Sequence, residues 1–502
     1  MRSTLEKDDL KGRMINMLEK LKDLNSFEAF KYFKEMNEIP RGSGNEKAIS
    51  DWLVSFAKEH NLKVIQDNAL NVIIKKPGTK GYENAKAIIL QGHMDMVCEK
   101  NTATVHDFEK DPIEFIVEGD AVRANGTTLG ADNGIAVAFG LAVLASEDIP
   151  HPPMELLVTT GEETGMGGAQ ALDPKNLDGR ILINIDSEEE GKLLVSCAGG
   201  VREKIKLKID WVEADKSFLN CVIRLTGLNG GHSGMEINKE RANANKTMGR
   251  FLMDLRSVID FKINSISGGA KNNAIPREAD AIILFRENDK AIVTQKISHW
   301  NTTLKNELNN IDPDVNLAIE ILGDKVSRTF SDDTATKALQ TLFLIPNGVK
   351  NMSMAIEGLV QSSTNIGVLT TTDENVVFDS AIRSSVRTLK KAICDETIVL
   401  AEMVGATIEF ESDYPEWQYN PNSEIRTVFE KVYKDLYGKM PEIAAIHAGL
   451  ECGLFSAKFD GKIDQISFGP NIYDVHTPKE HLSISSTDRM WSYLLAALKA
   501  MK

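Results

Sequence analysis

The segment AKAIILQGHMDMVC, residues 85–98, contains the strand on which the predicted fold is built. Its apolar run Ile88–Leu90 is typical of a buried parallel strand, and His93 and Asp95 follow where that strand should end. Side chains alternate along a strand, so these two residues point to the same side. A carboxylate at this spacing can orient a metal-binding imidazole, and open α/β sheets bind ligands beyond the carboxyl ends of their strands. For an isolated His-x-Asp pair a structural role is more common, so the inference depends on the other strands.

Acidic residues also lie at one end of three further apolar segments. Asp132 falls at the start of a helix predicted over 135–144. Glu162 and Glu163 follow a strand predicted over 154–160, and Asp186 follows a strand predicted over 180–185. A helix cap or a solvated surface pair explains any of them alone. Adjacent carboxylates repel each other unless a cation or a proton compensates, so their recurrence favours a cation site.

Composition limits the classes of partner and compartment. The 502-residue chain has 58 basic and 73 acidic residues, and this net charge of -15 argues against nucleic acid or an anionic membrane as the main partner. Residues 1–21 are charged throughout, and no apolar run of about 18 residues occurs, so we expect neither a signal peptide nor a membrane span. The five scattered cysteines fit reduced thiols, which indicates a cytoplasmic protein.

The order of the predicted elements indicates one domain inserted into another. A helix is predicted over 7–38, and helices and strands then alternate up to Gly199-Gly200, so the first domain is predicted to be α/β. Beyond this boundary, residues 204–285 suggest an α+β domain of the ferredoxin-like kind, and a comparable pattern over 329–411 suggests a duplicated half-domain. The predicted limits are 1–199 and 413–502 for the first domain and 200–412 for the insertion.

Two histidines join the acidic residues as candidate metal ligands. One is His93, and the other is His476 in the C-terminal segment DVHTPKEHL. Imidazoles and carboxylates together form a donor set that suits zinc, with manganese or cobalt as substitutes. One carboxylate shared between two ions permits the separation of roughly 3.5–4 Å found in two-metal hydrolases. His481 is an alternative to His476 as the C-terminal ligand.

A series of short motifs resembles a known enzyme family. In chain order they are IPRGSGNE, LQGHMDMV, GTTLGADNGIA, TGEETGMGGA, INIDSEE, GLNGGHSGMEI, NNAIPREA, IRSS, HAGLECGLF and HTPKE. They are similar to the co-catalytic-zinc metallopeptidases of the aminoacylase/carboxypeptidase type, and most of all to the bacterial aminoacyl-histidine dipeptidases, also called Xaa-His or cytosol non-specific dipeptidases. The resemblance implies a zinc-exopeptidase-like α/β catalytic domain with a mixed, largely parallel sheet, plus an inserted α+β lid domain.

The resemblance also implies a role for each candidate residue of the first domain. It implies two divalent ions, most commonly zinc, each with its own pair of ligands and one carboxylate shared by both: His93 with Asp186, Glu163 with His476, and Asp132 as the bridge. The family often has a cis peptide after the bridging residue, here before Asn133. Asp95 corresponds to the residue that orients His93. Glu162 corresponds to the general base that activates a water bridging the two ions.

Three positions of the predicted lid correspond to family residues that act on substrate. His232, in the motif GGHSG, corresponds to the lid histidine that helps hold the developing oxyanion. Without the motif, a surface histidine between glycines is the simpler interpretation. Asn273 and Arg383 correspond to positions that contact the backbone or carboxylate of the substrate. The resemblance assigns no role to His447 or Glu451, which lie in a Gly-rich turn.

The activity implied by the resemblance is metal-dependent hydrolysis of unblocked dipeptides, Xaa-His among them. An N-acyl amino acid deacylase or a tripeptidase on the same two-metal site is the alternative. A metal- or peptide-binding protein without catalysis is a third hypothesis, against which the complete ligand set and Glu162 argue. The expected partner is a small peptide substrate. The lid is expected either to form a homodimer interface or, if it is internally duplicated, to let the chain act as a monomer.

Overall fold

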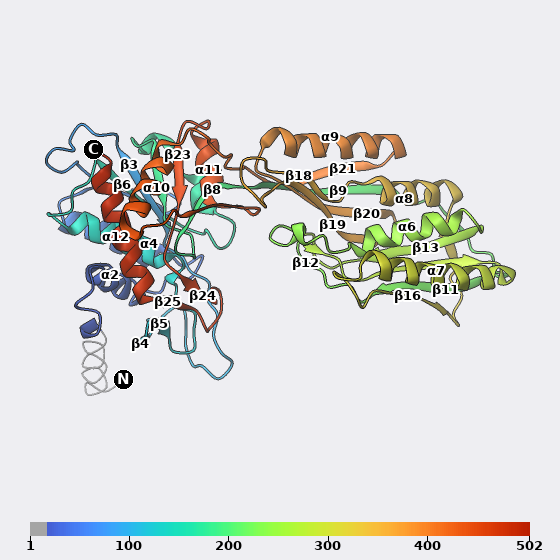
Figure 1. Cartoon of the computed structure of the whole chain (residues 1–502). Coiled ribbons are helices and arrows are strands. Elements are labelled where there is room, and N and C mark those ends of the chain that lie inside the picture. The colour runs from blue at the N-terminus through green and yellow to red at the C-terminus, as the bar shows by residue number, and fades with distance from the viewer. Residues whose placement is uncertain (1–17) are drawn as a thin grey trace. The chain divides into compact units, whose positions relative to one another are not determined.

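The structure, a computed structural model, describes residues 18–502 and divides into two units (Figure 1). Among the described residues, unit 1 comprises 18–196, 419–445 and 454–502, and unit 2 comprises Cys197–Gln418 and Ile446–Gly453. The sequence-based limits, 199/200 and 412/413, differ from these because Cys197 and Trp417 exchange two backbone hydrogen bonds of 3.0 and 3.1 Å where unit 2 begins and ends. The turn 446–453 joins unit 2 because the amide of Ala198 bonds the carbonyls of Ile446 and Ala448.

Unit 1 is built on an eight-stranded sheet of order β1-β2-β6-β3-β7-β23-β8-β22. Strands β6, β3, β7 and β23 are parallel to one another, and the neighbouring strands β1, β2 and β8 run antiparallel to them or to each other. The bounds are β1 Lys63–Gln66, β2 Val72–Lys76, β3 Ile88–His93, β6 Met154–Thr159, β7 Ile181–Asn184, β8 Lys192–Cys197, β22 Glu442–Ile446 and β23 Asp464–Ser467. The expected mixed α/β sheet is therefore confirmed, with parallel strands at its centre.

Helix α4 (Ala131–Ala145) is buried along nearly its whole length because its sequence is apolar on every side. It packs on β3, on β6 and on helix α2. The glycine at 140 permits this approach, since a Cβ there would lie 2.3 Å from Cδ1 of Leu156 on β6. The other helices of unit 1 are α2 (Phe27–Asn37), α3 (Lys47–Glu59), α5 (Gly167–Ala171), α10 (Glu424–Tyr437), α12 (Ile484–Ala500) and α11 (Glu451–Lys458), which spans the boundary with unit 2.

The single N-terminal helix predicted over 7–38 is wrong within the described residues, and its part over 7–17 lies outside them. Turns occupy residues 20–26, and α2 begins only at Phe27. The break has a tertiary cause, because the amide and hydroxyl of Ser26 both donate to the carboxylate of Asp488 on α12 at 2.8 Å. A contact between residues so distant in sequence leaves no trace in the local pattern.

A second sheet of unit 1 contains the C-terminal segment. Its order is β24-β25-β5-β4, and every pairing is antiparallel. The bounds are β4 Phe115–Glu118, β5 Ala121–Ala124, β24 Ile472–Tyr473 and β25 His481–Ser483. The loop between β24 and β25 therefore starts and ends in a fixed sheet, and it contains His476.

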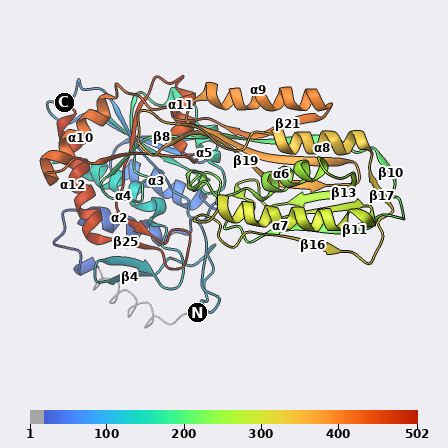
Figure 2. The same ribbon diagram turned by 45° about the vertical axis from the view of Figure 1, so that its right-hand side comes forward.

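Unit 2 is built on one antiparallel sheet of order β16-β11-β15-β13-β19-β20-β9-β21, with β18 paired to β19. Helices α6, α7, α8 and α9 contribute to a single apolar core with the sheet (Figure 2). The strands are β9 Gly199–Lys208, β11 Leu219–Thr226, β13 Phe261–Gly268, β15 Ala279–Phe285, β16 Asn316–Ile321, β18 Gly348–Met352, β19 Val360–Thr371, β20 Asn375–Ser384 and β21 Thr407–Tyr414. The helices are α6 Ala244–Arg256, α7 Lys290–Glu307, α8 Asp332–Leu344 and α9 Arg387–Val404.

The sheet of unit 2 consists of two halves with the same topology. In chain order β11-α6-β13-β15-α7-β16 forms one βαββαβ half with its strands arranged β16-β11-β15-β13. The other half is β9-α8-β19-β20-α9-β21, arranged β21-β9-β20-β19, which is the same order. The first half lies in sequence between β9 and α8 of the second. The predicted recurrence is thus present in the fold, although the strand that opens the second half is far from the rest in sequence.

Small paired strands in unit 2 and short 3-10 turns complete the fold. In unit 2, β10 (Trp211–Glu213) pairs with β17 (Arg328–Phe330), and β12 (Gly231–His232) pairs with β14 (Ala274–Ile275). Short 3-10 turns lie at Pro174–Asn176, Ile237–Lys239 and Glu287–Asp289. Within residues 18–502, no helix combines the length and the hydropathy required to cross a bilayer.

Candidate functional site

His93 is the last residue of β3 and is 1% exposed. Its Nδ1 lies 3.1 Å from the backbone carbonyl of Asp95 and 3.3 Å from the carboxylate of the same residue. Both partners are acceptors, so Nδ1 has a proton, and Nε2 points away from Asp95. The predicted orienting carboxylate thus lies beside the ring that it was expected to orient.

Asp132, near the start of α4, lies between two histidines. Its Oδ1 is 3.1 Å from Nε2 of His93, and its Oδ2 is 3.1 Å from Nε2 of His476. The two oxygens of one carboxylate therefore face two different imidazoles. The peptide bond from Asp132 to Asn133 is cis, as expected.

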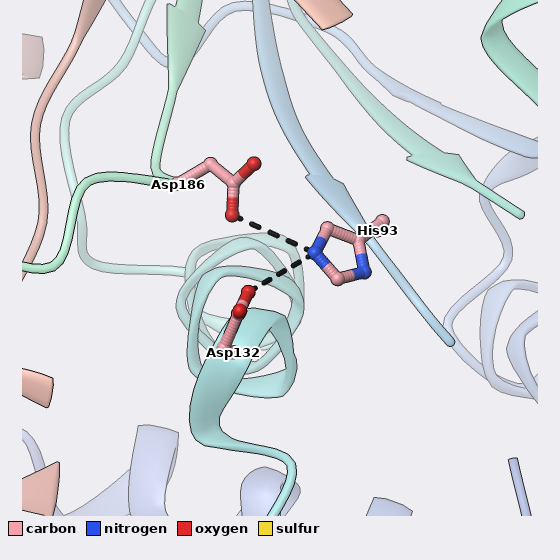
Figure 3. Close-up of side chains that lie close together, drawn as sticks. All are labelled: His93, Asp132 and Asp186. Atoms are coloured by element: carbon pink, nitrogen blue, oxygen red, sulfur yellow. Dashed lines mark hydrogen bonds and ion pairs between the residues drawn. The ribbon is translucent and has the colours of Figure 1, made fainter. Parts of the chain in front are cut away.

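Two further carboxylates complete the group, one beside each histidine. Oδ1 of Asp186 lies 3.6 Å from Nε2 of His93, so that His93 faces both aspartates (Figure 3). Oε2 of Glu163 lies 3.0 Å from Nε2 of His476. Glu162 offers a carboxylate oxygen within 4.8 Å of ligand atoms of His93 and Glu163. All seven candidate residues of the first predicted domain are therefore close together.

Asp95 has a second function that its position after β3 did not reveal. Its carboxylate accepts hydrogen bonds from the backbone amides of Glu162 and Glu163, at 3.1 and 3.4 Å, and from the hydroxyl of Ser43 at 2.8 Å. Because Asp95 is completely buried, these bonds fix the turn after β6 relative to the end of β3. One side chain thus orients His93 and holds the backbone of both glutamates.

The electrostatics of the group favour a cation. The hydrogen bonds that His476 donates to Asp132 and Glu163 raise its pKa to about 10. Burial raises the pKa of Asp186 to about 6, and burial with the nearby carboxylates raises the pKa of Glu188 to about 7. These carboxyl groups compete for the few positive charges near them, which is the arrangement that a bound cation relieves.

The donor set fits divalent metal ions. Two sets of three side chains, His93–Asp132–Asp186 and Asp132–Glu163–His476, each offer ligand atoms within 4.8 Å of one another. Two imidazole nitrogens and carboxylate oxygens are the ligands that zinc accepts in catalytic sites. Asp132 belongs to both sets, so the geometry accommodates two neighbouring ions with one shared ligand.

His476 rather than His481 lies in this group. His476 has a positive φ of 61°, in the loop between β24 and β25, and its side chain is about half exposed. His481 instead lies on β25, where its ring stacks on Tyr473 and its Nδ1 bonds the carbonyl of Lys479 at 3.0 Å. The ring of His476 therefore lies beside Asp132 and Glu163, whereas the ring of His481 lies against Tyr473.

In unit 2, the backbone fixes the protonation of His232. Its Nδ1 accepts hydrogen bonds from the amides of Gly234 and Met235, at 3.2 and 3.0 Å. The proton of the neutral ring must therefore be on Nε2, where it is available as a donor. Burial and the charge of Arg383 lower the pKa of His232, so the neutral form predominates.

The two other predicted lid residues lie near this histidine within unit 2. The carbonyl of Asn273 accepts from the amide of Ser233 at 2.9 Å, and a Cβ on Gly234 would lie 3.3 Å from Nε of Arg383. Arg383 donates to the hydroxyl of Tyr414 at 2.8 Å, and its buried Nε has no hydrogen-bond partner among residues 18–502. Asn273, Arg383 and Tyr414 line one cavity of about 180 Å³. An unpaired guanidinium donor beside a cavity suits an anionic ligand group.

The sequence did not reveal the residues that support Arg383. Nε2 of His447 lies 2.7 Å from the hydroxyl of Ser363, and Ser363 is the cross-strand neighbour of Arg383 on β19 and β20. Burial and the charge of Arg383 lower the pKa of His447 to about 3, so this imidazole is neutral. The Gly-rich turn had marked His447 as noteworthy, but Ser363 and Tyr414 had no local signal.

Comparison with known proteins gives a consistent result. The family model for Peptidase family M20/M25/M40 matches residues 89–500. The cytosol non-specific dipeptidase of Escherichia coli strain K12 is 40% identical over 469 residues, which cover 93% of this chain and 96% of that protein. The crystal structure of aminoacylhistidine dipeptidase from Vibrio alginolyticus has a TM-score of 0.92 at 39% identity, covering 95% of this chain and 97% of that one.

More distant structures share the fold. Aminopeptidase PepT from Bacillus cereus ATCC 10987 has a TM-score of 0.55 at 14% identity, covering 95% of this chain and 99% of that one. The metallopeptidase family expected from the sequence motifs is confirmed by the family match, which spans most of the chain. The chain belongs to peptidase family M20/M25/M40.

Proposed function

We propose that this chain is a metal-dependent dipeptidase that hydrolyses unblocked dipeptides, Xaa-His among them. The observation that supports this most strongly is Asp132, whose two carboxylate oxygens face the imidazoles of His93 and His476 from one side chain. Membership of a peptidase family and the 40% identity to a cytosol non-specific dipeptidase support the reaction class. The substrate is thus a small peptide.

We assign two divalent ions to this site, with zinc as the first choice and manganese or cobalt as substitutes. His93 and Asp186 would hold one ion, Glu163 and His476 the other, and Asp132 both. When bound, such ions supply Lewis acidity toward the scissile carbonyl and lower the pKa of a bound water to about 7.

Glu162 is proposed as the general base. Its carboxylate lies beside His93 and Glu163, and its backbone is fixed by the bond from its amide to Asp95. In this position it takes the proton of the attacking water and later passes it to the leaving amine. Asp95 keeps the proton of His93 on Nδ1, so that Nε2 can serve as a metal ligand.

The residues of unit 2 are proposed to bind and stabilise the substrate. The Nε2 proton of His232 suits a hydrogen bond to the oxyanion that develops on the scissile carbonyl. Arg383 and Asn273 are assigned to the substrate carboxylate and backbone, which agrees with the unpaired Nε of Arg383 beside a cavity.

Replacement of Glu162 by Gln tests the assignment. E162Q keeps the shape of the side chain but removes the base, so we expect kcat for an Ala-His dipeptide to fall about 10²- to 10⁴-fold while the protein still binds its full metal complement. Glu189, an exposed glutamate that pairs with Lys192, gives the control E189Q, which should leave kcat unchanged. Unchanged hydrolysis by metal-loaded E162Q would contradict the proposal.

A substrate panel separates the proposed dipeptidase from its alternatives. A deacylase prefers acetyl-amino acids, and a tripeptidase prefers three residues, whereas the proposed enzyme should cleave free dipeptides faster than either. A protein that binds metal without catalysis would hydrolyse none of them after loading with zinc or manganese. The panel is measured with and without chelator, and activity that survives removal of the metal would exclude the proposed mechanism.

The compartment and assembly belong to the same proposal. We propose a cytoplasmic location, which agrees with the cytosolic designation of the Escherichia coli relative and with five free cysteines. For assembly, the sequence leaves a homodimer through the lid and a monomer as the two hypotheses. Sedimentation equilibrium of the metal-loaded chain distinguishes the two masses directly.

A further inference from the structure

A buried arginine lies close to the candidate metal ligands of unit 1. Arg41 is 1% exposed, and its guanidinium donates to the carbonyls of Met94 at 3.0 Å and Gly130 at 2.6 Å and to the side chain of Asn37 at 2.9 Å. Met94 directly follows His93, and Gly130 is the residue from which α4 begins. Arg41 therefore joins the end of β3 to the start of α4.

A buried carboxylate binds the same turn with the opposite charge. Glu480 is 2% exposed and accepts hydrogen bonds from the first backbone amides of α4 and the residues before it. These bonds come from Leu129 (2.8 Å), Gly130 (3.1 Å), Ala131 (2.7 Å) and Asp132 (3.4 Å). A carboxylate at a helix N-terminus is stabilised by the first backbone amides, which have no partner within the helix, and by the helix dipole. Glu480 therefore connects the segment after His476 to α4.

Gly130 is held by both charges at once. Its amide donates to Glu480, and its carbonyl accepts from Arg41. The local glycines provide the space for the guanidinium, since a Cβ on Gly130 or on Gly134 would lie 2.5 or 2.7 Å from Nη2 of Arg41. The turn that places Asp132 is therefore built around a buried pair of opposite charges.

We propose that Arg41 and Glu480 are positioning residues that hold Asp132, His93 and His476 in the arrangement that binds metal. Neither residue is among the five proposed ligands, and each acts through the backbone next to a ligand. Arg41 fixes His93 relative to Asp132, and Glu480 fixes Asp132 relative to His476. The inference rests on the proposed metal site, and it adds two residues that determine the affinity of that site.

Metal affinity of two conservative variants tests the proposal. R41K keeps the charge but cannot reach three acceptors, and E480Q keeps the shape but presents an NH₂ group to the amides of α4. We expect each variant to raise the Kd for Zn²⁺ about 10- to 100-fold, measured on the full-length apoprotein by competition with a chromophoric chelator. The double variant should raise Kd by less than the product of the two single effects, because both residues hold one turn.

Matched controls separate positioning from general stability. E155Q changes a buried glutamate that accepts hydrogen bonds from the amides of Asp178 and Gly179. R426K changes a buried arginine that donates to the carbonyls of Asn420 and Pro421. Both controls lie in unit 1 outside the ligand group, and we expect their Kd for Zn²⁺ to stay within about twofold of that of the unchanged protein.

Each outcome of this experiment is decisive. If the unchanged protein binds none of Zn²⁺, Mn²⁺ and Co²⁺, the proposed function itself fails. If it binds Zn²⁺ and R41K and E480Q do not differ from the controls, only the positioning role is overturned. If R41K and E480Q lose the native far-UV circular dichroism while the controls keep it, the pair is required for folding rather than for affinity, which also overturns the proposal.

Discussion

At the scale of single residues, Glu203 on β9 is a buried carboxyl group in unit 2 that accepts a hydrogen bond from the hydroxyl of Thr397. Its neighbour Thr397 has one hydroxyl proton and lies within hydrogen-bond distance of both the carbonyl of Cys394 and the carboxyl of Glu203. A bond from this hydroxyl to Glu203 stabilises the ionised carboxylate and lowers its pKa, but burial has the larger effect. Burial raises the pKa of Glu203 to about 7, and the charge of Asp379 acts in the same direction.

This raised pKa makes the stability of unit 2 depend on pH. Between pH 4.5 and 7 the folded state keeps a proton that the unfolded state has lost, so the free energy of unfolding falls as pH rises through this interval. E203Q cannot ionise, so at pH 8 it should be more stable than the unchanged protein by roughly 1–3 kcal/mol, with the difference vanishing near pH 4.5. Urea unfolding of unit 2 across this range measures the difference in the free energy of unfolding.

An exposed glutamate on β21 provides the control, since E409Q should follow the unchanged protein. Equal pH slopes for all three proteins would refute the assignment.

At the scale of elements, the close contact between β3 and α4 fixes the candidate site. Gly92 on β3 has no side chain, and a Cβ there would lie 2.5 Å from Oδ1 of Asn133 and 2.7 Å from Cβ of Ala136. Asn133 in turn accepts from the amide of His93 at 3.3 Å and donates to the carbonyl of Ile185 at 2.8 Å. One amide side chain therefore links α4 to the ends of β3 and β7, from which three of the candidate ligands project.

Adding a methyl group at Gly92 should disturb this contact. We expect G92A to lower the free energy of unfolding of unit 1 by roughly 1–3 kcal/mol, because α4 must move or Asn133 must leave its partners. Gly167 in the same unit provides the comparison, since a Cβ there meets no atom within 4 Å. G167A should therefore change the stability by no more than about 0.5 kcal/mol. Thermal unfolding of both variants measures the difference, and equal stability would show that α4 adjusts without loss.

At the scale of the whole molecule, the sequence predicts what is local and misses what is distant. The alternation of a strand placed His93 and Asp95 on one side, and the apolar runs identified the strands of the parallel centre. The bonds of Glu480 to residues 129–132 and of Ser26 to Asp488 had no local signal, because their partners are far apart in the chain. For the same reason β9 could not be recognised as the first strand of a half whose other elements follow much later.

The division into two units predicts where metal binding stabilises the chain. Each unit has its own apolar core, and all the candidate ligands belong to unit 1. A ligand stabilises the structure that binds it by about 2.7 kcal/mol at a concentration of 100 Kd, which corresponds to roughly a 100-fold change in an opening equilibrium. Removal of metal by a chelator should therefore accelerate amide hydrogen exchange of α4 and β3 by up to that factor and leave β11 and β15 of unit 2 unchanged.

D132N, which lacks the shared carboxylate, should show the fast exchange of unit 1 with or without metal. Equal acceleration in both units would mean that they unfold as one cooperative structure, and its absence from both would place the metal elsewhere.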